Sequence, residues 1–125
     1  MKISVNNPII DNDIFHDNIL WIEPEGFPPY PEKSIYHGKK EIYEFVFLGF
    51  EKHLDFISIE PDTLIESTNS VFVLGNLKYK LKKAEDSLNV QALQIWDFEN
   101  NKIVKFQLFT NTKKVHDYFE KTKIE

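Results

Sequence analysis

The feature that most constrains the fold is a run of alternating apolar and polar residues that extends from Leu88 to Phe109. Alternation of this kind, with many β-branched and aromatic side chains, is typical of β-strands. Near the middle of the run stand Asn100 and Asn101, and two consecutive Asn residues suit the positive φ angles of a tight type I′ turn. We therefore predict a long β-hairpin that turns at these two residues.

The predicted turn also sets the register of the two strands. It pairs Glu99 with Lys102, and it puts Gln94 opposite Gln107 on the face that carries Trp96. One face of the hairpin is then almost wholly apolar, whereas the other combines large aromatic side chains with two opposed amides. A mixed face of this kind suits a half-hydrated environment, such as the wall of a pocket or a contact between subunits.

The composition limits the class of protein. A chain of 125 residues is long enough for one domain, residues 1–125, with a single core. Eleven Phe, five Tyr and two Trp need a sizeable interior, a pocket or an interface. The net charge of −5 argues against nucleic acid as the main partner, since phosphate binding needs a basic face.

Location and cofactors follow from features that the sequence lacks. The first ten residues hold one lysine and no long apolar run, which argues against a signal peptide. No segment approaches the roughly 20 apolar residues that span a bilayer, so we expect a cytoplasmic protein that does not bind membranes. There is no Cys, no metal-ligand spacing of His and no glycine-rich phosphate loop. Neither a metal nor another cofactor is therefore expected.

The first part of the chain is predicted from apolar periodicity. Residues 1–9 are expected to be loose, and residues 10–17 to form a short helix. Residues 18–23 are predicted as a strand that ends before a proline. Alternation along this strand places Trp21 and Glu23 on one face.

A proline-rich segment follows this strand. Residues 25–33 hold three prolines and a glycine, so they form neither a helix nor a central strand. We expect an ordered loop or flap, with Phe27 and Tyr30 as lid residues. A helix is predicted from about residue 39 to residue 52. The apolar residues at helical spacing on one of its faces are Ile42, Phe45, Val46, Gly49 and Phe50.

The remaining elements complete the predicted fold. Residues 54–60 and 71–81 are predicted strands, and Gly75 within the second marks a bend or a bulge. A final helix is expected from about residue 113 to residue 121. Because the strands follow one another and the helices are segregated, the fold class is α+β rather than parallel α/β.

Three short motifs occur in a fixed order along the chain. The first is Ile22-Glu23-Pro24-Glu25-Gly26, the second is His37-Gly38-Lys39-Lys40-Glu41-Ile42 followed by Phe45, and the third is the hairpin from Trp96-Asp97-Phe98 to Phe109. Their order and spacing resemble the nuclear transport factor 2-like superfamily, and specifically its SnoaL-like and ketosteroid-isomerase-like branch. The resemblance covers about residues 12–122.

This resemblance implies a cone-shaped, cystatin-like domain in which a curved antiparallel sheet wraps around helices and encloses an apolar cavity. Members are commonly homodimers joined through the sheet face, and many bind a small hydrophobic molecule. Some catalyse isomerisation, cyclisation, dehydration or hydrolysis. The resemblance therefore implies a protein that binds a small hydrophobic ligand, with or without lyase, isomerase or hydrolase activity. The alternative is a non-catalytic module of the same fold that serves in dimerisation or protein binding.

Two departures from this branch argue against ketosteroid isomerase activity itself. The full first helix of the family is shortened here, and the catalytic tyrosine that it carries in the isomerases is missing. The isomerases also place an acid on the hairpin strand, where this chain has Gln94. An amide donates a weaker hydrogen bond than a protonated carboxylic acid.

Glu23 is the leading candidate for chemistry. The resemblance matches it to the general base of the isomerases, and burial at the mouth of an apolar cavity raises the pKa of a carboxyl group. The plainer alternative is a polar residue that ends a strand and remains solvated.

The other candidates also have two interpretations each. His37 acts as an acid or base, or contacts an anionic ligand, or it is a surface histidine. Gln94 and Gln107 orient a ligand carbonyl, or they bond each other or water at a dimer interface. The phenols of Tyr36 and Tyr79 reach the pocket, or these residues pack with the hydroxyl outward. The predicted ligand-binding residues are Trp21, Phe27, Tyr30, Gln94, Trp96 and Gln107.

Overall fold

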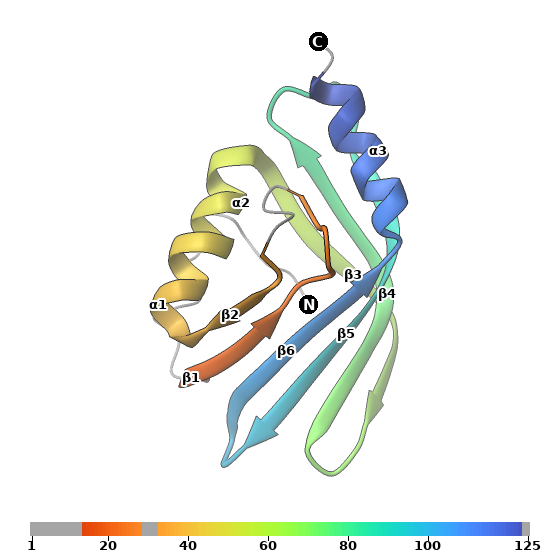
Figure 1. Ribbon diagram of the computed structural model, residues 1–125. Coiled ribbons are helices and arrows are strands. Elements are labelled where there is room, and N and C mark those ends of the chain that lie inside the picture. The colour runs from red at the N-terminus through yellow and green to blue at the C-terminus, as the bar shows by residue number, and fades with distance from the viewer. Residues whose placement is uncertain (1–13, 29–32, 124–125) are drawn as a thin grey trace.

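The structure is a computed structural model that describes residues 14–28 and 33–123. Its centre is a six-stranded sheet with the strand order β2-β1-β6-β5-β4-β3. The long strands bend around a helical segment, and a last helix lies at one end of the sheet (Figure 1). The elements are β1 (Phe15–Ile22), β2 (Ile35–His37), α1 (Gly38–Ile42), η2 (Tyr43–Phe47), α2 (Leu48–His53), β3 (Leu54–Glu66), β4 (Ser70–Leu81), β5 (Leu88–Glu99), β6 (Lys102–Thr110) and α3 (Thr112–Lys123).

The sheet is mixed rather than wholly antiparallel. Strands β3, β4, β5 and β6 pair antiparallel in succession, but β1 runs parallel to β6. The predicted α+β class is therefore confirmed, whereas the prediction of a purely antiparallel sheet is wrong. The parallel pairing is possible because β6 lies beside β1 only after the long connection formed by residues 23–101.

The start of the chain departs from the prediction. Residues 15–17 belong to β1 and not to a helix, since this segment forms sheet hydrogen bonds and buries Phe15. The strand predicted at residues 18–23 is confirmed, and alternation places Ile19, Trp21 and Glu23 in the interior. Residues 1–9 and the first part of the predicted helix lie outside the described residues.

The central hairpin and its turn are confirmed. Asn100 and Asn101 have φ angles of 51° and 66°, as a type I′ turn requires, and Glu99 pairs with Lys102. Beyond the turn, however, the register shifts by one residue, because β6 carries Val104 as an extra residue. The sequence pattern gave no sign of this bulge.

The bulge changes the partners on both faces of the hairpin. The observed pairs are Trp96 with Phe106, Gln94 with Leu108 and Ile95 with Gln107. The predicted opposition of Gln94 and Gln107 is therefore wrong. Gln94 is buried on the inner face, and Gln107 lies half-exposed on the outer face.

The predicted helix at residues 39–52 is confirmed in extent, since helical structure runs from α1 through η2 to α2. Its middle, η2, is π-helical, which changes the angular position of the residues that follow. Of the five apolar residues predicted on one face, Phe45 is not buried and is 41% exposed. Its ring stacks on Tyr36 with centroids 6.1 Å apart.

The irregularity predicted at Gly75 is confirmed. Gly75 pairs with Pro61, and the register of β3 and β4 shifts between Pro61 and Thr63. A side chain at Gly75 would overlap the carbonyl oxygen of Glu60 and would lie 2.9 Å from the Cα atom of Pro61. Glycine is therefore required where the two strands approach so closely.

The final helix is confirmed, and hydrogen bonds fix its first turn and its middle. The side chain of Asn111 accepts a hydrogen bond from the Lys114 N–H at 3.1 Å and caps its first turn. The hydroxyl of Tyr118 accepts from the Leu81 N–H at 3.0 Å and donates to the Asp86 carbonyl at 2.7 Å. These bonds hold α3 against the connection between β4 and β5. Among the described residues, no helix is long and apolar enough to cross a membrane.

Candidate functional site

The site is built around Glu23, which follows β1 on the inner face of the sheet and is 8% exposed. Its main-chain N–H donates to the Ser34 carbonyl at 2.8 Å. Its Oε1 atom accepts a hydrogen bond from the indole N–H of Trp21 at 2.9 Å. The two side chains lie on one face because they are two residues apart in an extended segment.

The environment of Glu23 shifts its protonation equilibrium. Burial raises the pKa of the Glu23 carboxyl group to about 7, because an ionised carboxylate is poorly solvated there. The hydrogen bond from Trp21 stabilises the ionised form and lowers the pKa, but burial is the larger effect. Near neutral pH both the acid and the carboxylate form are therefore populated.

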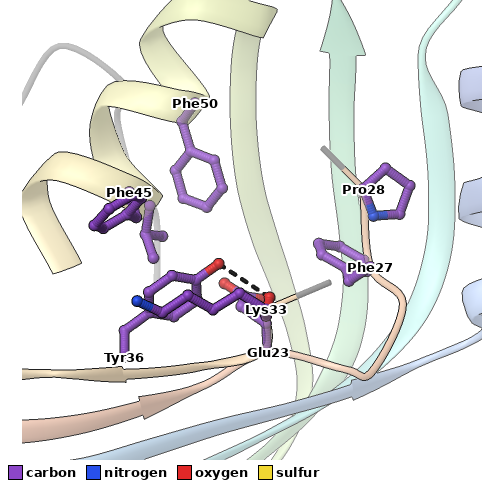
Figure 2. A pocket seen from close by; sticks show the side chains of 8 residues that line it. Glu23, Phe27, Pro28, Lys33, Tyr36, Phe45 and Phe50 are labelled. Carbon is purple, nitrogen blue, oxygen red and sulfur yellow. Dashed lines mark hydrogen bonds between the residues drawn. The ribbon is translucent and has the colours of Figure 1, made fainter. Parts of the chain in front are cut away.

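Glu23 faces a small pocket with mainly apolar walls (Figure 2). The pocket leaves about 20 Å³ for the centre of a water-sized molecule, which is room for about one water. A ring-sized ligand therefore requires the lining side chains to move apart. The lining residues are Glu23, Phe27, Pro28, Lys33, Tyr36, Phe45, Val46 and Phe50.

Local turn chemistry brings Phe27 into this wall. The Phe27 N–H donates to the Pro24 carbonyl at 3.2 Å, and Gly26 between them has a φ angle of 73°. This positive φ is readily adopted by glycine at the third position of a type II turn. The Pro-Glu-Gly-Phe sequence thus returns the chain to the interior directly after Glu23.

Lys33 provides a cation at the same pocket. Its ammonium group lies 4.6 Å from the ring centroid of Phe45 and 5.1 Å from that of Tyr36, and it pairs with Glu41 at 2.9 Å. The phenol of Tyr36 donates to the Lys33 carbonyl at 3.1 Å (Figure 2). The lysine is therefore held by two aromatic faces and a carboxylate rather than by Glu23.

A second space lies on the other side of Phe27, Pro28 and Phe50, which line both. It also leaves about 20 Å³ for the centre of a water-sized molecule. The hydroxyl-bearing side chain in its wall is Tyr79 of β4, which is 2% exposed. The further lining residues are Gly49, His53, Leu54, Ile57 and Phe119.

The structure brings some of the predicted site residues together. Glu23 and Phe27 line one pocket, and Trp21 reaches it through the hydrogen bond to Glu23. Gln94 and Trp96 are buried and line neither of the two spaces. The Trp96 indole N–H donates to Gln94 Oε1 at 3.1 Å.

Aromatic rings fill the region between Glu23 and Gln94. The ring of Trp21 lies 4.0 Å from that of Phe106 and 6.1 Å from that of Trp96, centroid to centroid. Glu23 and Gln94 therefore do not share a cavity wall. Each instead accepts a hydrogen bond from an indole two residues earlier or later in the sequence.

The other predicted site residues lie elsewhere. His37 is exposed at the start of α1, where its main-chain N–H donates to Glu41 at 3.3 Å, and it lines neither space. Gln107 is on the outer face of the sheet. Tyr30 lies outside the described residues. Among the residues that are described, no group of three or more His, Asp or Glu is arranged to hold a metal ion.

Sequence reasoning did not single out Lys33. Its place in the pocket depends on the return of the proline-rich loop to β2, which no periodicity predicts. Phe50 was predicted as a buried helix residue and not as part of a site. The burial of Tyr79 follows from the alternation along β4, in which it lies on the same face as the buried Leu77 and Leu81.

The sequence matches the family described as the SnoaL-like domain over residues 12–106. This stretch contains both Glu23 and Tyr79 and extends into β6. None of the curated proteins matches the chain.

Solved structures share the fold. A nuclear transport factor 2-like protein from Burkholderia thailandensis has a TM-score of 0.78 at 24% identity, over 90% of this chain and 85% of its own. One of unknown function from Burkholderia pseudomallei has a TM-score of 0.74 at 25% identity, over 83% and 78%. TerC, co-crystallised with polyporic acid, has a TM-score of 0.75 at 20% identity, over 86% and 81%. The fold is thus the α+β fold of nuclear transport factor 2-like proteins.

Proposed function

Because the chain belongs to the family of SnoaL-like domains, we propose that it binds a small, mostly apolar molecule and that Glu23 removes a proton from that molecule as a general base. One observation carries the proposal. The Oε2 atom of Glu23 is buried, has no hydrogen-bond partner among the described residues, and belongs to a side chain that faces an apolar pocket.

The chemistry of a general base fits this arrangement. A base is most effective when its pKa lies near the working pH, and burial raises the pKa of Glu23 to about 7. Trp21 holds one carboxyl oxygen at 2.9 Å, which orients the other. Proton removal from a carbon next to a carbonyl group begins isomerisations, cyclisations and eliminations. The same carboxylate activates a water molecule in a hydrolysis.

The ligand class follows from the walls of the pocket. Four of its lining residues are Phe or Tyr, and the acid that faces them is Glu23. Such walls favour a flat molecule with few polar atoms. TerC, a protein of the same fold, was co-crystallised with polyporic acid, which supports a small-molecule ligand for this chain as well.

The test compares Glu23→Gln with Glu25→Gln. Both substitutions convert a glutamate into its amide, but Glu25 is exposed two residues further along the chain. A panel of cyclic ketones and phenols is screened for binding and for proton exchange into deuterated water. We expect exchange that rises with pH through about 7 in the wild type, is retained in Glu25→Gln and is lost in Glu23→Gln. Undiminished exchange in Glu23→Gln would show that Glu23 is not the base.

A second proposal concerns the outer face of the sheet, where apolar side chains gather. Ile65, Leu74 and Phe109 are 58%, 45% and 48% exposed. The strand register aligns them with the half-exposed Phe72, Leu93 and Ile95 in two neighbouring rows. We propose that this patch joins two copies of the chain. A non-catalytic module of the same fold would use this surface and would have no need of Glu23.

A further inference from the structure

We propose that Tyr79 is a second polar anchor of the ligand site, so that the ligand carries a hydrogen-bond acceptor at the end opposite to the atom that meets Glu23. This inference rests on the proposed function, because it assigns a second contact to the same ligand. It limits that ligand to molecules with two polar ends and an apolar body between them.

The first observation is that the hydroxyl of Tyr79 has no hydrogen-bond partner in residues 14–28 and 33–123. Two buried side-chain oxygen atoms find no hydrogen-bond partner among the residues that the structure describes, and these are Glu23 Oε2 and the Tyr79 hydroxyl. Buried polar groups in folded proteins almost always have a partner, and leaving one without a partner costs stability. Two such atoms in adjoining spaces therefore point to a common function.

The second observation is the geometry of the two spaces. Glu23 lines one and Tyr79 lines the other, and Phe27, Pro28 and Phe50 line both. These three residues stand between the two spaces, and the wall of each space includes a residue with one of the two buried, unpartnered oxygen atoms. Burial is the main cause of the raised pKa of Tyr79, and the charges of Tyr118 and then of Glu23 add to it. When Phe27 and Phe50 move apart, one ligand reaches both groups.

The third observation is that the Tyr79 ring is fixed. It packs edge-on against Tyr118, with centroids 6.0 Å apart, and lies 6.2 Å from Phe119. Its strand position is set by pairing with Ile57 on one side and Leu88 on the other. The hydroxyl is therefore held in place before any ligand binds, which lowers the entropy cost of using it.

The protonation states define the two ends of the ligand. Burial raises the pKa of the Tyr79 phenol above its usual range, so the phenol keeps its proton and acts as a donor at neutral pH. Glu23 acts as an acceptor when it is ionised. A matching ligand presents a carbonyl or similar oxygen to Tyr79 and a proton-bearing atom to Glu23.

Tyr118 provides a matched comparison on the same side of the fold. Its hydroxyl already bonds to Leu81 and Asp86, at 3.0 Å and 2.7 Å. Tyr118→Phe therefore removes two structural hydrogen bonds, whereas Tyr79→Phe removes a hydroxyl that has no partner within the described part of the chain. We expect Tyr118→Phe to lower the melting temperature and Tyr79→Phe to leave it unchanged or raise it by roughly 2–5 °C.

The binding test uses three ligands of one size. A hydroxytetralone carries a ketone and a phenol at opposite ends of two rings, tetralone keeps only the ketone, and tetrahydronaphthol keeps only the phenol. Dissociation constants are measured by titration calorimetry for the wild type, Tyr79→Phe and Glu23→Gln. We expect Tyr79→Phe to raise the dissociation constants of the two ketones by about tenfold and to leave that of tetrahydronaphthol unchanged.

The outcomes separate this inference from the proposed function. Equal binding of hydroxytetralone by the wild type and Tyr79→Phe overturns the role of Tyr79 and leaves the role of Glu23 standing. A fall in melting temperature of Tyr79→Phe as large as that of Tyr118→Phe also overturns it, since the hydroxyl would then have a partner within the fold. If no probe binds the wild type, the proposed function and the Tyr79 anchor fail together.

Discussion

At the scale of single residues, the two indole groups of the inner face have the same arrangement. Trp21 donates to Glu23 and Trp96 donates to Gln94, in each case to a residue two positions away in the sequence. The amide of Gln94 is neutral, so its burial costs little free energy once it is hydrogen-bonded. The carboxylate of Glu23 receives one donor from a described residue, and its ionised form therefore remains costly in the interior.

This cost predicts how stability depends on pH. The pKa of Glu23 is about 7 in the folded protein and near 4.5 when exposed in the unfolded chain, so the folded state binds more protons between these values. The contribution of Glu23 to the free energy of unfolding is therefore fully present below about pH 4.5 and is lost as the pH rises through about 7. The shift corresponds to about 3 kcal/mol of unfolding free energy.

Chemical denaturation at about pH 5 and about pH 8 measures this effect. We expect the wild type and Glu25→Gln to lose stability at the higher pH and Glu23→Gln to lose much less. His53 has the opposite effect on the pH dependence of the free energy of unfolding. Partial burial lowers its pKa in the folded protein, so its contribution to stability increases as the pH rises. A pH dependence that is the same in the wild type and Glu23→Gln would contradict the assignment.

At the scale of elements, the close crossing of β3 and β4 depends on a missing side chain. The carbonyl of Glu60 occupies the position that a Cβ atom on Gly75 would take. We expect Gly75→Ala to lower the unfolding free energy by about 1–3 kcal/mol, since the strands must separate to admit the methyl group. Lys78→Ala, on the same strand, is the control and is expected to have a small effect. Equal stability of the two variants in urea would contradict this account.

The elements also show what sequence patterns predict. Asn100 and Asn101 predicted the turn because its backbone angles suit few residue types. Val104 gave no comparable signal, since a bulge depends on how β6 fits both β5 and β1. That one extra residue placed Gln94 and Gln107 on opposite faces.

The helical segment shows the same limit. Periodicity located it correctly, but the predicted buried face included Phe45, which lies within the π-helical turn and is exposed at the rim of the pocket. Local patterns therefore predicted which elements form. They did not predict the shifts of one residue that decide which side chains meet at the site.

At the scale of the whole molecule, the resemblance of a few motifs located Glu23, but the partners of Glu23 come from distant parts of the chain. The pocket combines the end of β1, the loop before β2 and the helical segment (Figures 1 and 2). Tyr79 of β4 lines the adjoining space, which shares Phe27, Pro28 and Phe50 with this pocket. Such combinations depend on the curvature of the sheet, which no local pattern encodes.

The apolar outer face of the sheet predicts self-association. Replacing Leu74 with Lys puts a charge at the centre of the patch without touching the interior, since Leu74 is 45% exposed. We expect the wild type to be a dimer by light scattering and Leu74→Lys to be a folded monomer. Lys78→Ala, outside the patch, is expected to remain dimeric. A wild type that is monomeric at all concentrations would contradict the proposal.

The central claim is that Glu23 is a buried carboxyl group that changes protonation near neutral pH. A pH titration of the side-chain carboxyl carbons by NMR tests it without any ligand, and Glu23→Gln identifies the signal. The account predicts that the Glu23 signal titrates with a midpoint at about 7. A midpoint near 4.5, the ordinary value for a glutamate, would contradict it and remove the basis for assigning Glu23 as the base.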